Sequence, residues 1–145
     1  MKILLTLNKT LSSPTNTWID GGYWNVYLPL LDMGHEVYFY DTVAAEEDYD
    51  QVVKNFEPEL IFCCFTNDQS IAPREPWEQV KRYTDSSEIT TFNWFCDETW
   101  RFNSFSKHAC HHFNVSSTQK KNAKKYMTSA SVAILIKTEQ NTLTF

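Results

Sequence analysis

Glycine is scarce in this chain. Only three of the 145 residues are glycines, Gly21, Gly22 and Gly34, and none follows Gly34. Dinucleotide-binding G-x-G-x-x-G loops and P-loops need several glycines at fixed spacing, because their backbone must approach phosphate groups closely. Neither pattern can be written anywhere in the sequence. Its absence excludes the standard dinucleotide-binding and P-loop NTPase classes.

Long apolar runs are also lacking. The N-terminal run in residues 1–5 is too short for a signal peptide, and no segment approaches the length of a membrane span. No C-x-x-C spacing occurs among the cysteines, two of which are neighbours on an expected buried strand. That usage is typical of reduced thiols, and we expect a cytoplasmic protein. The cysteines are Cys63, Cys64, Cys96 and Cys110.

Positive charge is in deficit. The chain has 13 Lys and Arg against 18 Asp and Glu, a net charge of −5. This balance argues against nucleic acid or an anionic membrane as the partner. Acids concentrate in residues 41–59, whereas lysines concentrate in residues 120–125, where we expect a solvated helix face.

Short apolar runs alternate with amphipathic segments, which is the pattern of βα repeats. We predict an α/β fold: a Rossmann-like, three-layer α/β/α domain with a doubly wound, mostly parallel sheet of about six strands. Residues 1–137 form one domain in this interpretation, and residues 138–145 are a tail or the start of a connection. The expected strands cover residues 2–7, 36–40, 60–65, 89–95, 113–116 and 132–136, with helices between them and a loop at 8–20.

Gly21 and Gly22 open the first expected helix after that long loop. A helix N-terminus presents free N–H groups, and glycine lets a ligand approach the backbone. A phosphate, a carboxylate or a sugar hydroxyl would suit this position, and the alternative is a tight turn before the helix. Asp20 weakens a strictly anionic ligand. Pro29 inside the helical pattern predicts a kink or an early helix end.

Two adjacent acids, Asp97 and Glu98, follow the apolar run that ends at Phe95. Neighbouring carboxylates at the rim of a sheet are candidates for acid–base chemistry, since their pKa values separate. Arg101 would pair with an acid or bind an anionic ligand, and a purely structural ion pair is the alternative. The nearby histidines and cysteines match no zinc spacing. We therefore expect neither a metal nor a cofactor.

Several stretches resemble a known family. The segment Gly34-His35-Glu36-Val37, after Gly21-Gly22 and a helix, resembles the opening of GT-B glycosyltransferases. Residues 57–61 resemble the entry to a later strand of that fold. More specifically, Trp94-Phe95-Cys96-Asp97-Glu98-Thr99-Trp100-Arg101-Phe102 and the later Lys124-Lys125-Tyr126 are similar to the CgeB-like (spore maturation protein) glycosyltransferases. The resemblance spans about residues 1–136.

The resemblance implies the acceptor-side, N-terminal half of an enzyme that transfers sugar from a nucleotide-sugar donor to an acceptor. In this family a second, C-terminal domain holds the donor, and the chain is expected to be inactive without such a domain or a partner chain. The resemblance assigns catalysis to Asp97 and Glu98 and substrate binding to Gly21, Gly22, Trp100 and Arg101. Glu98 departs from the family, which usually has a second Asp there.

A competing hypothesis is a non-catalytic Rossmann-like module for binding or protein interaction. Aromatic side chains such as Trp18, Trp24 and Trp100 would then form a protein contact or a homodimer interface. Binding of nucleotide sugars would favour the glycosyltransferase half, and absence of binding would favour the non-catalytic module.

Overall fold

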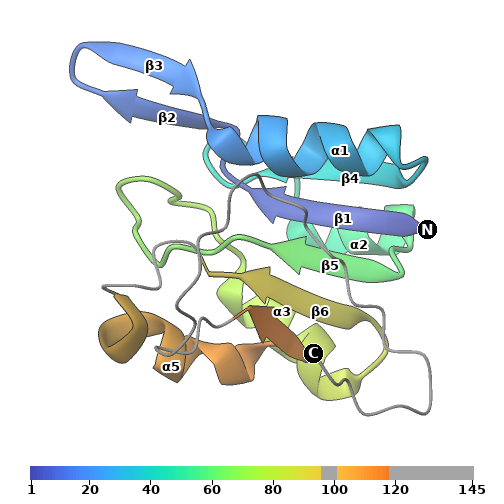
Figure 1. Cartoon of the computed structure of the whole chain (residues 1–145). Coiled ribbons are helices and arrows are strands. Elements are labelled where there is room, and N and C mark those ends of the chain that lie inside the picture. The colour runs from blue at the N-terminus through green and yellow to red at the C-terminus, as the bar shows by residue number, and fades with distance from the viewer. Residues whose placement is uncertain (96–100, 118–145) are drawn as a thin grey trace, which may run out of the picture.

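A parallel five-stranded sheet forms the centre of the molecule. The computed structural model describes residues 1–95 and 101–117. The strand order is β4-β1-β5-β6-β7, and every neighbouring pair is parallel (Figure 1). The strands are β1 (Lys2–Leu7), β4 (Glu36–Asp41), β5 (Leu60–Cys63), β6 (Thr90–Trp94) and β7 (Val115–Ser117). The expected α/β class and parallel sheet are confirmed.

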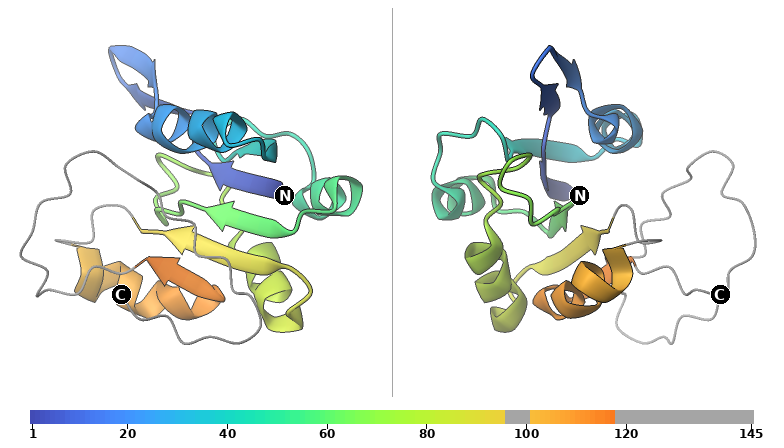
Figure 2. Two further views of the ribbon diagram at one scale, coloured as in Figure 1. Left: turned by 45° about the vertical axis from the view of Figure 1, so that its right-hand side comes forward. Right: turned by 90° about the vertical axis from the view of Figure 1, so that its left-hand side faces the viewer.

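Helices cover both faces of this sheet. The helix formed by η1 (Tyr23–Tyr27) and α1 (Leu28–Asp32) lies on one face, and α2 (Tyr49–Phe56) and α3 (Trp77–Ser86) lie on the other (Figure 2). Successive residues of a strand point to opposite faces, so Ile3 and Leu5 pack under α1 whereas Leu4 packs under α2 and α3. The two resulting cores make the domain the three-layer, doubly wound sandwich that the βα alternation predicts.

The sheet has five strands in the described residues, rather than the six expected. The strand expected at 132–136 and the Lys-rich helix before it lie outside the described residues, as does the segment 138–145. The short elements η2 (Phe102–Ser106), α5 (Lys107–Ala109) and η3 (Cys110–His112) connect to β7. No helix in residues 1–95 and 101–117 has the length and apolar character needed to cross a membrane.

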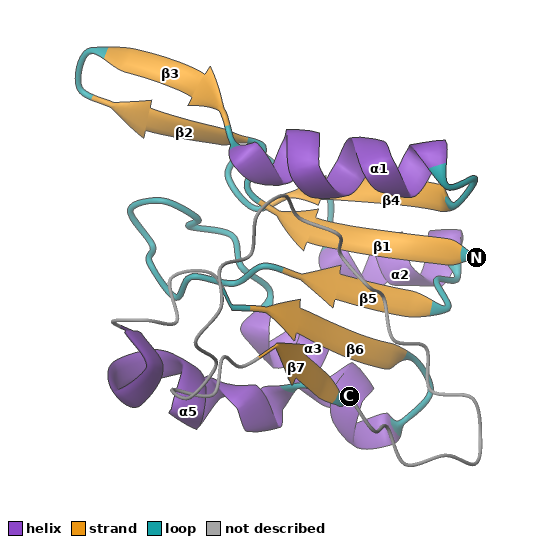
Figure 3. Ribbon diagram, in the orientation of Figure 1, coloured by secondary structure: helices purple, strands orange, loops and turns teal. Residues whose placement is uncertain are grey.

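The expected loop at 8–20 is a β-hairpin, which corrects that prediction. Strands β2 (Thr10–Ser13) and β3 (Asn16–Ile19) pair antiparallel and project from the sheet (Figure 3). The hydroxyls of Ser12 and Thr17 are 3.0 Å apart across the hairpin. The prediction failed because both strands lack an alternating apolar face: every residue of β3 is exposed.

Pro29 neither stops the first helix nor leaves it regular. The backbone runs helical to Asp32, so an early end is wrong, but the turn before Pro29 is a π-helix. A π-turn widens the helix where the proline ring would contact a carbonyl of the preceding turn. Gly34 ends the helix, with φ +80° and its N–H donated to the Leu31 carbonyl at 2.9 Å.

Candidate functional site

The strand order reverses at β1. The chain places β4 on one side of β1 and then crosses back to place β5 on the other. In open parallel sheets, ligands bind outside the carboxyl ends of the strands at such a reversal. The segments that leave β1 and β5, beginning at Asn8 and Cys64, therefore mark the candidate site. The arrowheads of β1, β4, β5 and β6 point to this edge (Figure 1).

Arg101 reaches this edge from a distant part of the chain. Its Nη2 donates a hydrogen bond to the carbonyl of Thr66, three residues after the end of β5. The guanidinium carbon also lies 4.6 Å from the centre of the Phe105 ring. This placement brings one residue singled out in the sequence to the loop that leaves β5, beside the strand reversal.

A glutamate that the sequence analysis did not single out organises the same loop. The Glu75 carboxylate accepts hydrogen bonds from the backbone N–H of Thr66, from the Asn67 N–H at 2.8 Å and from the indole N–H of Trp77 at 2.8 Å. Burial raises the pKa of Glu75, and these hydrogen bonds oppose that rise. An acid between two prolines, directly before a helix, was the signal available in the sequence.

Asn93 links the end of β6 to the segment leaving β5. It is fully buried, and its side-chain oxygen accepts the N–H of Phe65 at 3.0 Å. Its Nδ2 has no hydrogen-bond partner, and the buried hydroxyl of Ser106 has none either. At the next strand, the Ser117 hydroxyl accepts the N–H of Phe95 at 3.1 Å. Polar side chains thus line the carboxyl ends of β5, β6 and β7.

The Gly21-Gly22 turn serves the packing of the first helix on β1. The Asp20 carboxylate accepts the Gly22 N–H at 2.7 Å, so an anion at this turn would compete with Asp20 for that donor. A Cβ on Gly22 would lie 3.0 Å from Asp20 Oδ1 and 3.2 Å from Leu7 Cδ1. Gly21 is exposed, and its carbonyl accepts from Asn25 Nδ2 at 2.8 Å.

Three of the candidate residues, Asp97, Glu98 and Trp100, lie outside the described residues. The residues that flank them are both at the carboxyl edge. Phe95 directly follows β6, and its ring centre is 5.6 Å from that of Phe105, against which Arg101 lies. Phe95 and Arg101 thus both contact Phe105 at this edge of the sheet.

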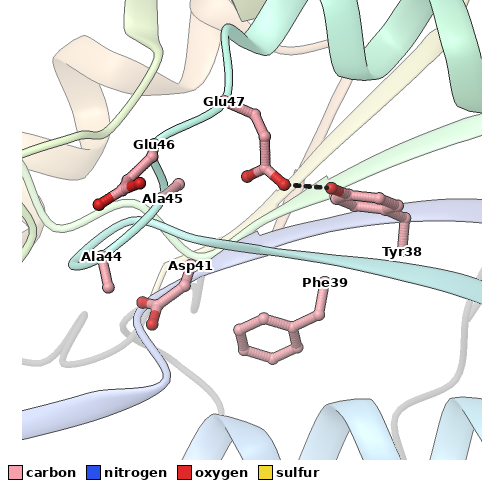
Figure 4. A pocket seen from close by; sticks show the side chains of 7 residues that line it. All are labelled: Tyr38, Phe39, Asp41, Ala44, Ala45, Glu46 and Glu47. Atoms are coloured by element: carbon pink, nitrogen blue, oxygen red, sulfur yellow. Dashed lines mark hydrogen bonds between the residues drawn. The ribbon is translucent and has the colours of Figure 1, made fainter.

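An open pocket of about 550 Å³ lies along the outer edge of β4, away from the candidate site (Figure 4). The rings of Tyr38 and Phe39 lie on opposite sides of the strand, and Tyr38 donates to Glu47 at 3.1 Å. Burial and this carboxylate raise the pKa of Tyr38. Three acidic residues line the pocket. It lies beside β4, the edge strand, and not between β1 and β5, where the strand order reverses. Its lining is Tyr38, Phe39, Asp41, Ala44, Ala45, Glu46 and Glu47.

The described residues hold no grouping suited to a metal ion. Within residues 1–95 and 101–117, no three His, Cys, Asp or Glu side chains converge in that way. Cys63 and Cys110 are free thiols, and burial raises the pKa of Cys63 well above its usual value. Cys63 behaves as an apolar core residue rather than as a nucleophile.

Comparisons with protein-family models, with curated proteins and with solved structures gave no match to this chain.

Proposed function

We propose that this chain is the acceptor-side half of a glycosyltransferase that uses a nucleotide-sugar donor. The placement of Arg101 carries the proposal: its guanidinium lies on the Thr66 carbonyl, beside the strand reversal where parallel sheets bind ligands. A guanidinium at that edge suits the diphosphate of a nucleotide sugar. The similarity of residues 94–102 to CgeB-like glycosyltransferases supports the same activity.

The two acids next to Arg101 would supply the chemistry. Asp97 or Glu98 takes the proton of an acceptor hydroxyl while that oxygen bonds to the anomeric carbon of the donor. The bond from this carbon to the diphosphate breaks, and its electron pair leaves with the phosphate oxygen. Trp100 and Arg101 would hold the substrates beside the acids, and Gly21 and Gly22 would approach the donor phosphates or the acceptor.

A second wall is required for the donor. The proposed site lies at one open edge of a single sheet, and enclosure of a nucleotide sugar needs a further domain or partner chain. We therefore expect weak donor binding and little turnover by this chain alone. The coding sequence after Phe145 tests this directly, because a following Rossmann-like domain would supply the missing wall.

Titration with UDP- and GDP-sugars, followed by NMR, tests the binding itself. Millimolar ligand is expected to shift the amide signals of Gly21, Gly22 and Asp97 together with the side-chain signal of Arg101. Signals of Val52 in α2, which is buried on the far face of the sheet, serve as the control. Absence of any shift at the carboxyl edge would contradict the enzyme-half function for this chain.

The exposed hairpin favours a second candidate, a protein-interaction module. Trp18 on β3 is 46% exposed and Trp24, on the helix that follows, is 54% exposed. Aromatic side chains are enriched at protein interfaces. Sedimentation of the chain and of a Trp18→Ser, Trp24→Ser variant distinguishes the candidates: concentration-dependent association that the variant loses favours the module.

A further inference from the structure

Both oxygens of the Glu75 carboxylate are occupied by donors from one loop and one helix. Oε1 accepts the backbone N–H of Thr66 and the Thr66 hydroxyl, the latter at 3.0 Å. Oε2 accepts the Asn67 N–H and the Trp77 indole N–H, each at 2.8 Å. The carboxylate therefore holds the first turn of the loop after β5 against the start of α3.

One of these bonds is made to the peptide group that binds Arg101. The carbonyl of Thr66 and the N–H of Asn67 belong to the same planar unit, so fixing the N–H fixes the direction of the carbonyl. Glu75 accepts that N–H, and Arg101 donates to that carbonyl. Hydrogen bonds in series polarise one another, and a peptide bound by a carboxylate becomes a better acceptor for a guanidinium.

The backbone at Asn67 has a less common conformation. Asn67 has φ +53°, in the left-handed region that residues other than glycine occupy infrequently. A conformation of this kind persists where surrounding contacts hold it, and the Glu75 bond to the Asn67 N–H is one of them. Without that bond, the Thr66–Asn67 peptide loses one of the contacts that restrict its orientation, and with it the orientation of the carbonyl that accepts from Arg101.

From this geometry we propose that Glu75 is the positioning residue for Arg101, acting through the Thr66–Asn67 peptide. The role requires a carboxylate rather than an amide, because all four groups facing its oxygens donate hydrogen. In Glu75→Gln, the NH₂ group would face two of these donors. The part of the inference that concerns ligand binding rests on the proposed function; the positioning of Arg101 does not.

The test is the side-chain Nε–H signal of Arg101 in ¹⁵N-resolved NMR spectra of the whole chain. The chain has three arginines, so Arg101→Lys identifies the signal by its loss. We expect Glu75→Gln to move and broaden the Arg101 signal. The Arg82 signal should stay in place, since Arg82 pairs with Asp50 at 2.7 Å. Glu47→Gln, which alters an exposed acid bonded to Tyr38, is the matched control.

An Arg101 signal that is unchanged in a folded Glu75→Gln variant overturns the proposal. If that variant does not fold, Glu75→Asp provides the same test, because a side chain shorter by one methylene cannot reach all four donors. An equal shift of the Arg101 signal in Glu47→Gln would also overturn the proposal, since the signal would then respond to a general loss of stability rather than to Glu75.

Ligand binding adds a separate measurement with UDP as the probe. Glu75→Gln is expected to weaken UDP binding about tenfold, the effect of losing one well-oriented guanidinium contact. In an Arg101→Lys background the same substitution should have a much smaller effect, because the two residues act in series. If UDP does not bind the unmodified chain, the proposed function fails, while the Arg101 signal still decides the positioning role.

Discussion

The side-chain oxygen of Asn93 accepts the backbone N–H of Phe65 at 3.0 Å, which ties the end of β6 to the segment leaving β5. Asn93 is fully buried, so this hydrogen bond lies in the interior of the domain. This hydrogen bond supports the candidate site, because Phe65 directly precedes Thr66 in the loop that also carries Glu75.

Asn93→Ala is therefore expected to lower the free energy of unfolding by about 1–3 kcal/mol, the cost of leaving a buried N–H without an acceptor. Urea denaturation measures the change. Thr90→Ala, at an exposed position of the same strand, is the control and should stay within about 0.5 kcal/mol of the unmodified chain. Equal effects of the two substitutions would show that Asn93 contributes no more than its strand position.

The two adjacent glycines should respond oppositely to alanine. Gly22→Ala places a methyl group 3.2 Å from the buried Leu7 side chain and 3.0 Å from Asp20, so we expect destabilisation by about 1 kcal/mol. Gly21→Ala meets only Asn25 Nδ2, at 3.4 Å, and should stabilise the helix by about 0.5 kcal/mol. Thermal unfolding of the pair checks this. The same sign for both variants would contradict the close packing of Gly22 on β1.

Glu57 ends α2 in the left-handed region, at φ 51°. Glycine adopts that conformation without steric cost, and Glu57→Gly is expected to raise the free energy of unfolding by about 0.5–1 kcal/mol. Lys54→Gly, at an exposed position inside the same helix, should lower it by about 1 kcal/mol. Chemical denaturation of both variants measures the contrast, and destabilisation by Glu57→Gly would refute the expectation.

Stability is expected to fall between pH 10 and pH 12 through Tyr83. Burial and a hydrogen bond to Asp50, 2.8 Å away, raise the pKa of Tyr83 to about 12 from the ordinary value of 10.0. The folded chain therefore retains a proton that the unfolded chain releases. The resulting stabilisation is complete below pH 10 and is lost as the pH rises towards 12.

Tyr83→Phe should remove the part of the stability loss between pH 10 and pH 12 that the Tyr83 hydroxyl causes. Urea denaturation at several pH values in this range measures the change. Tyr38 and Tyr40 also have raised pKa values, so a shallower decline should remain in the variant. A decline as steep as that of the unmodified chain would rule out Tyr83 as a contributor.

The sequence pattern predicts the helix α2 but neither the hairpin formed by β2 and β3 nor the role of Glu75. Tyr49, Val52 and Val53 recur at helical spacing because they form the buried face of α2. This helix lies between β4 and β5, where the alternation of segments predicts one. The hairpin at 10–19 was missed because its strands bury no continuous face. Glu75 was missed for a related reason: its partners come from Thr66, Asn67 and Trp77, and no periodicity marks a side chain that binds a loop.

The amino-acid sequence by itself determined the alternation of strands and helices, the scarcity of glycine loops and the acid pair before Arg101. Each is a local property of neighbouring residues, because apolar spacing and backbone freedom act over a few positions. Only the tertiary structure decided which distant residues meet. The contact of Arg101 with Thr66, held by Glu75 on the other side of the same peptide, joins three segments that only the crossovers of the sheet bring together.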